Sequence, residues 1–81
     1  MRGLFEYYNI RKTNAKAYFE KFETAYDAAV DAMSTAKDEV DEELRSAYLD
    51  LANAQLALAT RYYEAGDKEM RDAMEKFVCE F

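Results

Sequence analysis

Apolar side chains recur every three or four residues through the first half of the chain, which is the spacing of one face of a helix. From residue 15 onward this face reads Ala15, Tyr18, Phe19, Phe22, Ala25, Tyr26, Ala29, Met33 and Ala36. The phase continues backward through RKTN (residues 11–14) to Leu4, and no glycine, proline or change of phase interrupts it. The pattern predicts one continuous helix over residues 3–36, although the threonine and asparagine of RKTN are also residue types that begin a new helix.

The next helix begins among cap-forming and acidic residues. Thr35 is followed three residues later by Asp38, which is the spacing of a capping box, and carboxylates crowd the expected positive end of the helix. The main apolar stripe of this helix is Val40, Leu44, Ala47, Tyr48, Leu51, Ala54, Leu58, Tyr62 and Ala65. Gly66 follows as a residue typical of a helix C-terminus, so the sequence predicts a second helix over residues 38–65.

The second helix carries a further apolar stripe, rotated by roughly 120° from the first. This second stripe reads Leu49, Ala52, Leu56, Ala59 and Tyr63. A helix with two apolar faces needs two neighbours. The segment after Gly66 offers one, because Asp67 can cap a helix whose apolar residues lie on one side. The sequence predicts a short third helix over residues 68–80, long enough to cover the second stripe.

The predicted fold is all-α. One domain, residues 1–81, forms an antiparallel three-helix bundle in which two long helices make a hairpin and a short C-terminal helix packs beside them. The composition agrees, since the chain has no proline and only two glycines. Small residues at facing positions of the hairpin are Ala25, Ala29 and Ala36 against Ala47 and Ala54. They allow a close approach of the two helices, so we expect this end to project as a two-helix arm.

Charge is unevenly distributed along the chain. Of the net charge of −6, residues 1–22 carry +3, residues 23–50 carry −7 and residues 51–81 carry −2. The projecting arm is therefore the acidic part. A protein that binds the phosphates of DNA or RNA presents clustered lysine and arginine, so direct binding to nucleic acid is not expected here.

The acidic arm is the first candidate binding surface. Its carboxylates lie on the predicted outer ridge of the first helix and around the connection to the second: Asp27, Asp31, Asp38, Glu39, Asp41, Glu42 and Glu43. Such a surface favours a protein partner with a basic surface, because opposite charges speed the association of two proteins. The alternative is an ordinary solvated helix face whose acids only complement the helix dipole.

The second candidate is an amino-terminal patch that includes Phe5, Ile10 and Arg11. Phe5 and Ile10 fall on opposite flanks of the main stripe, so one neighbouring helix cannot bury both. Aromatic side chains and arginine are enriched in interaction hot spots. The alternative is that a third helix covers one flank, while Arg11 lays its stem over the core and its guanidinium reaches water or a carboxylate.

Catalytic and metal-binding chemistry has few candidate residues. The chain has no histidine and a single cysteine, Cys79, so the commonest general base and the usual zinc ligands are missing. We therefore expect no enzymatic activity, no cofactor and no metal site. The chain also lacks an apolar run of about 18 residues and a signal peptide pattern. These absences predict a cytoplasmic protein without a membrane partner.

Together these features predict a small acidic protein that binds another protein and modulates or inhibits it. The setting that this size and charge favour is a phage or mobile-element protein acting on host machinery, such as an anti-CRISPR-type or other anti-defence inhibitor. Two alternatives stay open. One is a structural helical subunit that forms a homodimer through its remaining apolar faces. The other is a DNA-mimic inhibitor that uses the acidic arm.

Overall fold

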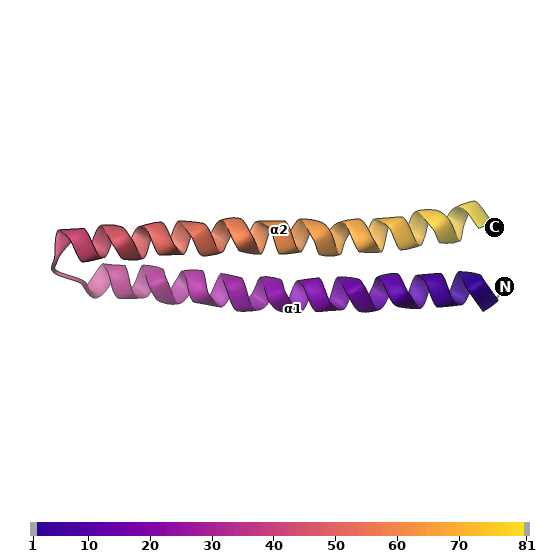
Figure 1. The fold of residues 1–81 in the computed structure, drawn as a ribbon, viewed down its shortest axis with the longest axis horizontal. Helices are drawn as coiled ribbons and strands as arrows, with labels where there is room; N and C mark the ends of the chain where they lie inside the picture. The colour runs from indigo at the N-terminus through magenta and orange to yellow at the C-terminus, as the bar shows by residue number, and fades with distance from the viewer. Residues whose placement is uncertain (1, 81) are drawn as a thin grey trace.

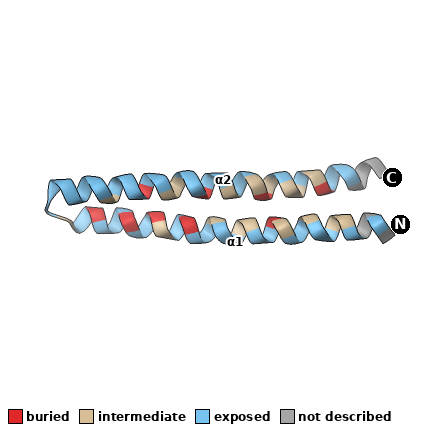
Figure 2. Ribbon diagram, viewed as in Figure 1, coloured by how far each residue is buried: buried red, intermediate tan, exposed pale blue. Residues whose placement is uncertain are grey.

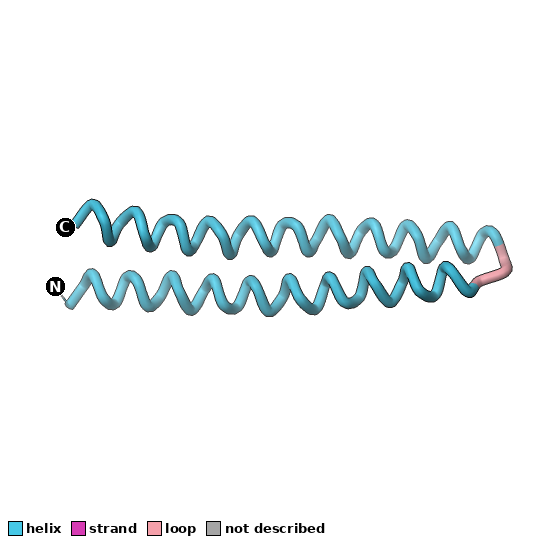
Figure 3. The backbone as a smooth tube through the Cα atoms, turned by 180° about the vertical axis from the view of Figure 1, so that it is seen from behind, coloured by secondary structure: helices cyan, strands magenta, loops and turns pink. Residues whose placement is uncertain are grey.

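Two long antiparallel helices make up the fold (Figure 1). The computed structural model describes residues 2–80, and individual side chains from residue 6 to residue 76. Helix α1 spans Arg2–Asp38 and helix α2 spans Glu42–Glu80. The two ends of the chain lie at one end of the hairpin, and the short connection lies at the other (Figure 3). The predicted all-α hairpin of two long helices is confirmed, whereas the three-helix bundle is not.

Helix α1 runs without a break through RKTN (residues 11–14), as the unbroken phase of its apolar positions predicts. Arg11 and Asn14 are half-buried and Ala15 is buried, so this segment lies against α2. The polar residues do not end the helix, and the guanidinium of Arg11 pairs with a carboxylate on the facing helix.

Helix α2 continues where the sequence predicts a stop. Gly66 does not adopt the positive φ of a helix C-terminus, and it is buried against α1. Asp67 does not begin a new helix but pairs with Arg71 one turn further along α2, with 3.1 Å between Oδ2 and Nε. The predicted third helix over residues 68–80 is therefore the last part of α2, which ends at Glu80.

Three residues, 39–41, connect the helices, and Asp41 caps α2. The Oδ1 atom of Asp41 accepts hydrogen bonds from the backbone N–H groups of Glu43 at 2.9 Å and Leu44 at 3.0 Å. These groups belong to the first turn of the helix, where backbone donors have no partner within the helix. The cap therefore fixes the first residue of α2.

The end of α1 also differs from the prediction. The capping box expected from Thr35 and Asp38 is absent, because α1 extends to Asp38 and the Thr35 hydroxyl donates to the backbone carbonyl of Asp31 at 2.9 Å. Arg45 closes the connection instead, donating from Nε and Nη2 to the backbone carbonyl of Glu39 at 3.1 and 2.9 Å. The true cap, Asp41, lies six residues after the predicted one, Thr35.

The buried positions between the helices hold only small residues (Figure 2). The buried apolar residues are Ala15, Ala25, Ala29, Ala32, Ala36, Ala52, Ala59 and Ala73. On α2 they form one row with Gly66, spaced by seven residues, which is the repeat of a helix that keeps one seam against its partner. Small side chains in both helices let the backbones approach closely. No large side chain among those described is fully buried.

The seam on α2 is not the stripe that the sequence predicts. Ala52 and Ala59, assigned to the second stripe, are the residues buried against α1, whereas Leu51 and Leu58 of the main stripe are exposed. The predicted facing alanines are correct for α1 and wrong for α2, where Ala47 and Ala54 are exposed. The row of small residues faces α1 because small side chains let the two helix backbones approach closely.

The hairpin is elongated, and its surface is large for its mass. Its backbone measures 61 by 15 by 11 Å, with a radius of gyration of 18.1 Å, against about 12 Å for a compact chain of this length. Its accessible surface is 6262 Å², against about 5,000 Å² for a compact monomer of this mass. The described fold therefore leaves exposed much of the surface that a compact domain buries.

Candidate protein-binding surface

An aromatic cluster lies across the middle of the hairpin. The ring of Tyr63 on α2 packs against Phe19 and Phe22 on α1, with ring centroids 5.7 and 5.4 Å apart. Phe22 also contacts Tyr26 one turn further along α1, at 5.8 Å between centroids. Phe19 and Phe22 are half-buried, while Tyr26 and Tyr63 are exposed. The cluster joins the two helices yet remains open to a partner on one side.

Gly66 makes room for this cluster. A Cβ atom built at Gly66 would lie 2.7 Å from the Cε1 atom of Phe19, which is closer than carbon atoms approach one another. The ring of Phe19 therefore occupies the space that any larger residue at position 66 would need. This packing explains why a glycine stands inside a long helix, where it lowers intrinsic helix stability.

The cluster is part of a larger apolar surface, which we call the aromatic face. A groove of about 640 Å³ between Phe19, Phe22, Tyr63 and Met70 lies on this side of the hairpin. Helical periodicity places further residues of both helices on the same side, because steps of four and seven residues return to one face. The aromatic face comprises Phe19, Phe22, Tyr26, Val30, Met33, Leu49, Leu56, Tyr63, Met70 and Met74.

The opposite side of the hairpin is different in character. Its groove of about 490 Å³ is lined on α1 by small and polar residues such as Ala17, Thr24 and Ala28. Lys21 lies over the ring of Tyr62 on α2, with Nζ 5.8 Å from the ring centroid. Large apolar residues come here mainly from α2, as an exposed leucine ridge spaced by seven residues: Leu44, Leu51 and Leu58.

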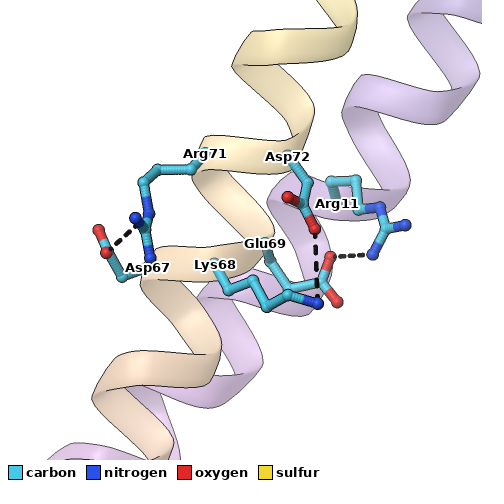
Figure 4. A network of polar contacts seen from close by, with 6 residues as sticks. All are labelled: Arg11, Asp67, Lys68, Glu69, Arg71 and Asp72. Atoms are coloured by element: carbon cyan, nitrogen blue, oxygen red, sulfur yellow. Dashed lines mark hydrogen bonds and ion pairs between the residues drawn. The ribbon is translucent and has the colours of Figure 1, made fainter.

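Near the chain ends an ion pair joins the two helices (Figure 4). Nη1 of Arg11 donates to Oε2 of Glu69 at 2.7 Å, and both side chains are partly buried. The guanidinium also lies over the ring of Tyr7, 5.1 Å from its centroid. The hydrogen bond to Glu69 raises the pKa of Arg11 above its ordinary value. Further ion pairs within α2 lie near it or one to two turns before it on the helix, including Arg61–Glu64, Lys68–Asp72 and Arg71–Asp67.

The predicted amino-terminal patch is only partly assembled. Arg11 is paired with Glu69, as one of the two interpretations expects. Ile10 is 61% exposed and lies away from the aromatic cluster, on the opposite flank of α1. The Phe5 side chain lies outside the described residues. The described part of the patch therefore offers one exposed apolar residue beside a satisfied arginine.

The acidic candidates fall into two groups. Asp41 and Glu39 serve the connection: Asp41 caps α2, and its own N–H donates to Oε1 of Glu39 at 3.1 Å. The other five are exposed and face solvent on the outer side of α1 or at the start of α2: Asp27, Asp31, Asp38, Glu42 and Glu43. They form an acidic end of the hairpin around the connection.

The exposure of the aromatic face is not predicted above from the sequence, because every residue of the face except Val30 is expected on an apolar stripe inside a three-helix bundle. The spacing of large apolar residues along the sequence does contain a signal for this exposed face. Large apolar residues recur every seven positions at Phe19, Tyr26 and Met33, and again at Leu49, Leu56 and Tyr63. Each row runs beside a row of small residues, which indicates a narrow seam with large side chains on its flank.

The described residues contain neither a candidate metal site nor a candidate membrane-spanning helix. No group of three metal-ligating side chains comes together among them. No described helix has an apolar stretch long enough to cross a membrane. The chain matches no family model, curated protein or solved structure.

Proposed function

We propose that this chain is a non-catalytic protein-binding module whose aromatic face packs against helices of a polypeptide partner. The observation that supports this proposal is the size of the buried residues. Among the described side chains, every buried one is alanine, while large apolar residues on both helices stay exposed beside them. Contiguous exposed apolar surface of this kind is typical of interaction sites.

The hairpin supplies one of the two neighbours that the pattern of α2 requires. The row of small residues on α2 is covered by α1, but Leu49, Tyr63 and Met74 remain exposed. A helix of a partner laid along the aromatic face would cover them and supply the missing layer. Burying that surface would favour binding by about 25 cal/mol per Å² before the costs of association.

The acidic end gives the module a preference among partners. Residues 21–60 carry nine acidic and three basic side chains, a net charge of −6, and they make up the half of the hairpin that contains the connection. Exposed carboxylates at the edge of an apolar surface favour a partner with basic residues at the corresponding positions. A module of this kind modulates its partner by occupying the surface that the partner's own helices would use.

A pull-down with two matched variants tests this proposal. Val30→Lys with Leu49→Lys places two charges on the aromatic face, and Leu51→Lys with Leu58→Lys places two on the leucine ridge. The four residues are similarly exposed, at 40, 44, 48 and 43%. We expect a protein, either another chain or an untagged copy of this one, to be retained by the wild type and by the ridge variant but lost from the face variant.

The experiment should be done at physiological salt, with circular dichroism showing that each variant keeps its helix content. If the face variant and the wild type retain the same proteins, the aromatic face is not the binding surface. If neither retains any protein, the chain does not work as a binding module.

A further inference from the structure

The area, charge and symmetry of the aromatic face indicate which polypeptide binds to it. We propose that this face packs against the aromatic face of a second copy of the chain, with the two hairpins antiparallel, so that the connection of each lies over the chain ends of the other. This inference rests on the proposed function, because it names the partner of the same surface. The result would be a four-helix assembly with a shared core.

The area of the face is sufficient for a stable dimer. The backbone of the hairpin measures 61 by 15 Å in the plane of its two helices, a projected area of roughly 900 Å², whereas a standard stable interface buries about 800 Å² on each partner. Face-to-face stacking along the whole length reaches this value. It would also cover most of the exposed surface by which the lone hairpin exceeds a compact monomer.

The charge distribution favours the antiparallel orientation. The half with the connection, residues 21–60, has a net charge of −6, whereas the half with the chain ends, residues 1–20 and 61–81, has eight acidic and eight basic side chains. A parallel pair would place two strongly acidic halves together. An antiparallel pair places each acidic half against a neutral one, which avoids this repulsion.

The positions along the face agree with a twofold axis at the middle of the hairpin. The midpoints of α1 and α2 are residues 20 and 61, so the cluster of Phe19, Phe22 and Tyr63 lies at the centre. In an antiparallel pair this cluster meets its own copy. Leu49 and Met74 lie about equally far on either side of the midpoint of α2. In the antiparallel pair, Leu49 of one copy therefore faces Met74 of the second copy. A twofold interface requires such self-complementarity.

Two charged residues beside the cluster follow the same symmetry. Lys16 and Glu23 line the groove of the aromatic face, on opposite sides of the midpoint of α1. Neither Lys16 nor Glu23 forms an ion pair with another described residue of its own chain. In the antiparallel pair Lys16 of each copy lies toward Glu23 of the other, which gives both residues a partner of opposite charge.

Sedimentation equilibrium tests the self-association with the variants already described. At micromolar concentration we expect the wild type and the Leu51→Lys with Leu58→Lys variant to have twice the chain mass of 9.4 kDa. We expect the Val30→Lys with Leu49→Lys variant to sediment as a single chain at the same concentration, because each copy would bring two lysines, four in all, into the apolar interface. Circular dichroism again checks that the helices remain.

The orientation needs its own measurement. A spin label at Val40→Cys, in a Cys79→Ser background, lies in the exposed connection. In the antiparallel dimer the two labels lie at opposite ends, separated by about the 61 Å length of the hairpin. In a parallel dimer they would lie side by side, so a short distance between labels overturns the proposed orientation.

The outcomes separate this inference from the proposed function. A wild-type protein that stays a single chain overturns self-association, and so does a dimer that is lost in the ridge variant but kept in the face variant. If the single chain still retains another protein through the aromatic face, the proposed function stands and only its partner is different. If no protein depends on the face, both are wrong.

Discussion

At the scale of single residues, the sequence correctly indicates that a glycine is needed at position 66, but it predicts the wrong reason. Its presence in a run of helix formers suggests a helix end, because glycine is the usual residue there. In the structure its lack of a side chain serves packing instead, since the ring of Phe19 fills that space. Sequence spacing could not reveal this contact, because the two residues belong to different helices.

The pair makes a testable prediction about Gly66→Ala. In the wild-type chain we expect this change to lower the free energy of unfolding by up to about 2 kcal/mol, because overpacking costs about 1–3 kcal/mol and alanine returns about 1 kcal/mol of helix propensity. In a Phe19→Ala background the clash is gone, and the same change should raise the free energy of unfolding by about 1 kcal/mol. Urea denaturation at one fixed protein concentration measures both.

Gly3→Ala serves as the control, because nothing lies within 4 Å of a Cβ built at that position. Its effect should be the same with Phe19 or Ala at position 19. If Gly66→Ala also has one effect in both backgrounds, the ring of Phe19 does not determine which residue is accepted at position 66.

Arg11 is the residue at which the sequence posed two clear alternatives, and the structure decides between them. A cation on an apolar stripe is either a binding residue or one that pairs internally, and the 2.7 Å contact with Glu69 shows the internal pair. The identity of Glu69 as partner could not be predicted, because the sequence predicts that the second helix ends before Glu69 and that Glu69 belongs to a separate third helix.

At the scale of elements, the start of α2 depends on a single side chain. We expect Asp41→Ala to lower the free energy of unfolding by about 1 kcal/mol, because it removes the acceptor of two backbone hydrogen bonds in the first turn. Asp41→Asn should have a much smaller effect, because asparagine is also a good N-cap. Thermal or urea unfolding followed by circular dichroism measures each variant.

Glu42→Ala is the matched control for the cap. It removes a neighbouring carboxylate of the first turn and its favourable interaction with the helix dipole, which is worth about 0.3–1 kcal/mol. A loss at Glu42 as large as that at Asp41 would mean that charge, and not the capping geometry, stabilises this end of α2.

Most of the course of each helix could be predicted from the sequence. The side on which each helix packs against its neighbour could be predicted much less well. The periodicity gives α1 correctly through RKTN, and it places the alanines Ala25 and Ala29 in the seam. On α2 two stripes compete, and hydrophobicity favours the one with Leu51 and Leu58. The helix buries the other stripe, because a pair of helices approaches most closely through small residues. The number of neighbours, which decides between the stripes, is not encoded in either stripe alone.

At the scale of the whole molecule, the two helices of the hairpin carry the apolar faces of a larger helical bundle, of which the hairpin supplies half of the helices. Three-helix packing was predicted because both faces of α2 are apolar, and that requirement remains although the third helix does not exist as a separate element. Proteins remove large exposed apolar surfaces either within the chain or by association. The acidic end then determines how copies orient, since like charges resist being stacked.

The dimer predicts that stability depends on protein concentration. If each hairpin folds against a second copy, mass action makes the melting temperature of the wild type fall on dilution, with each tenfold dilution costing about 1.4 kcal/mol per mole of dimer. The Val30→Lys with Leu49→Lys variant should melt at a lower temperature that does not change with concentration, because it lacks the interface. The ridge variant should follow the wild type. Melting curves by circular dichroism over a hundredfold range of protein concentration measure this effect. Over that range the free energy of unfolding of the dimer changes by about 2.7 kcal/mol, which is enough to distinguish the variants. A wild-type melting temperature that stays constant over that range contradicts the dimer, and it would mean that the seam of alanines alone holds the hairpin together.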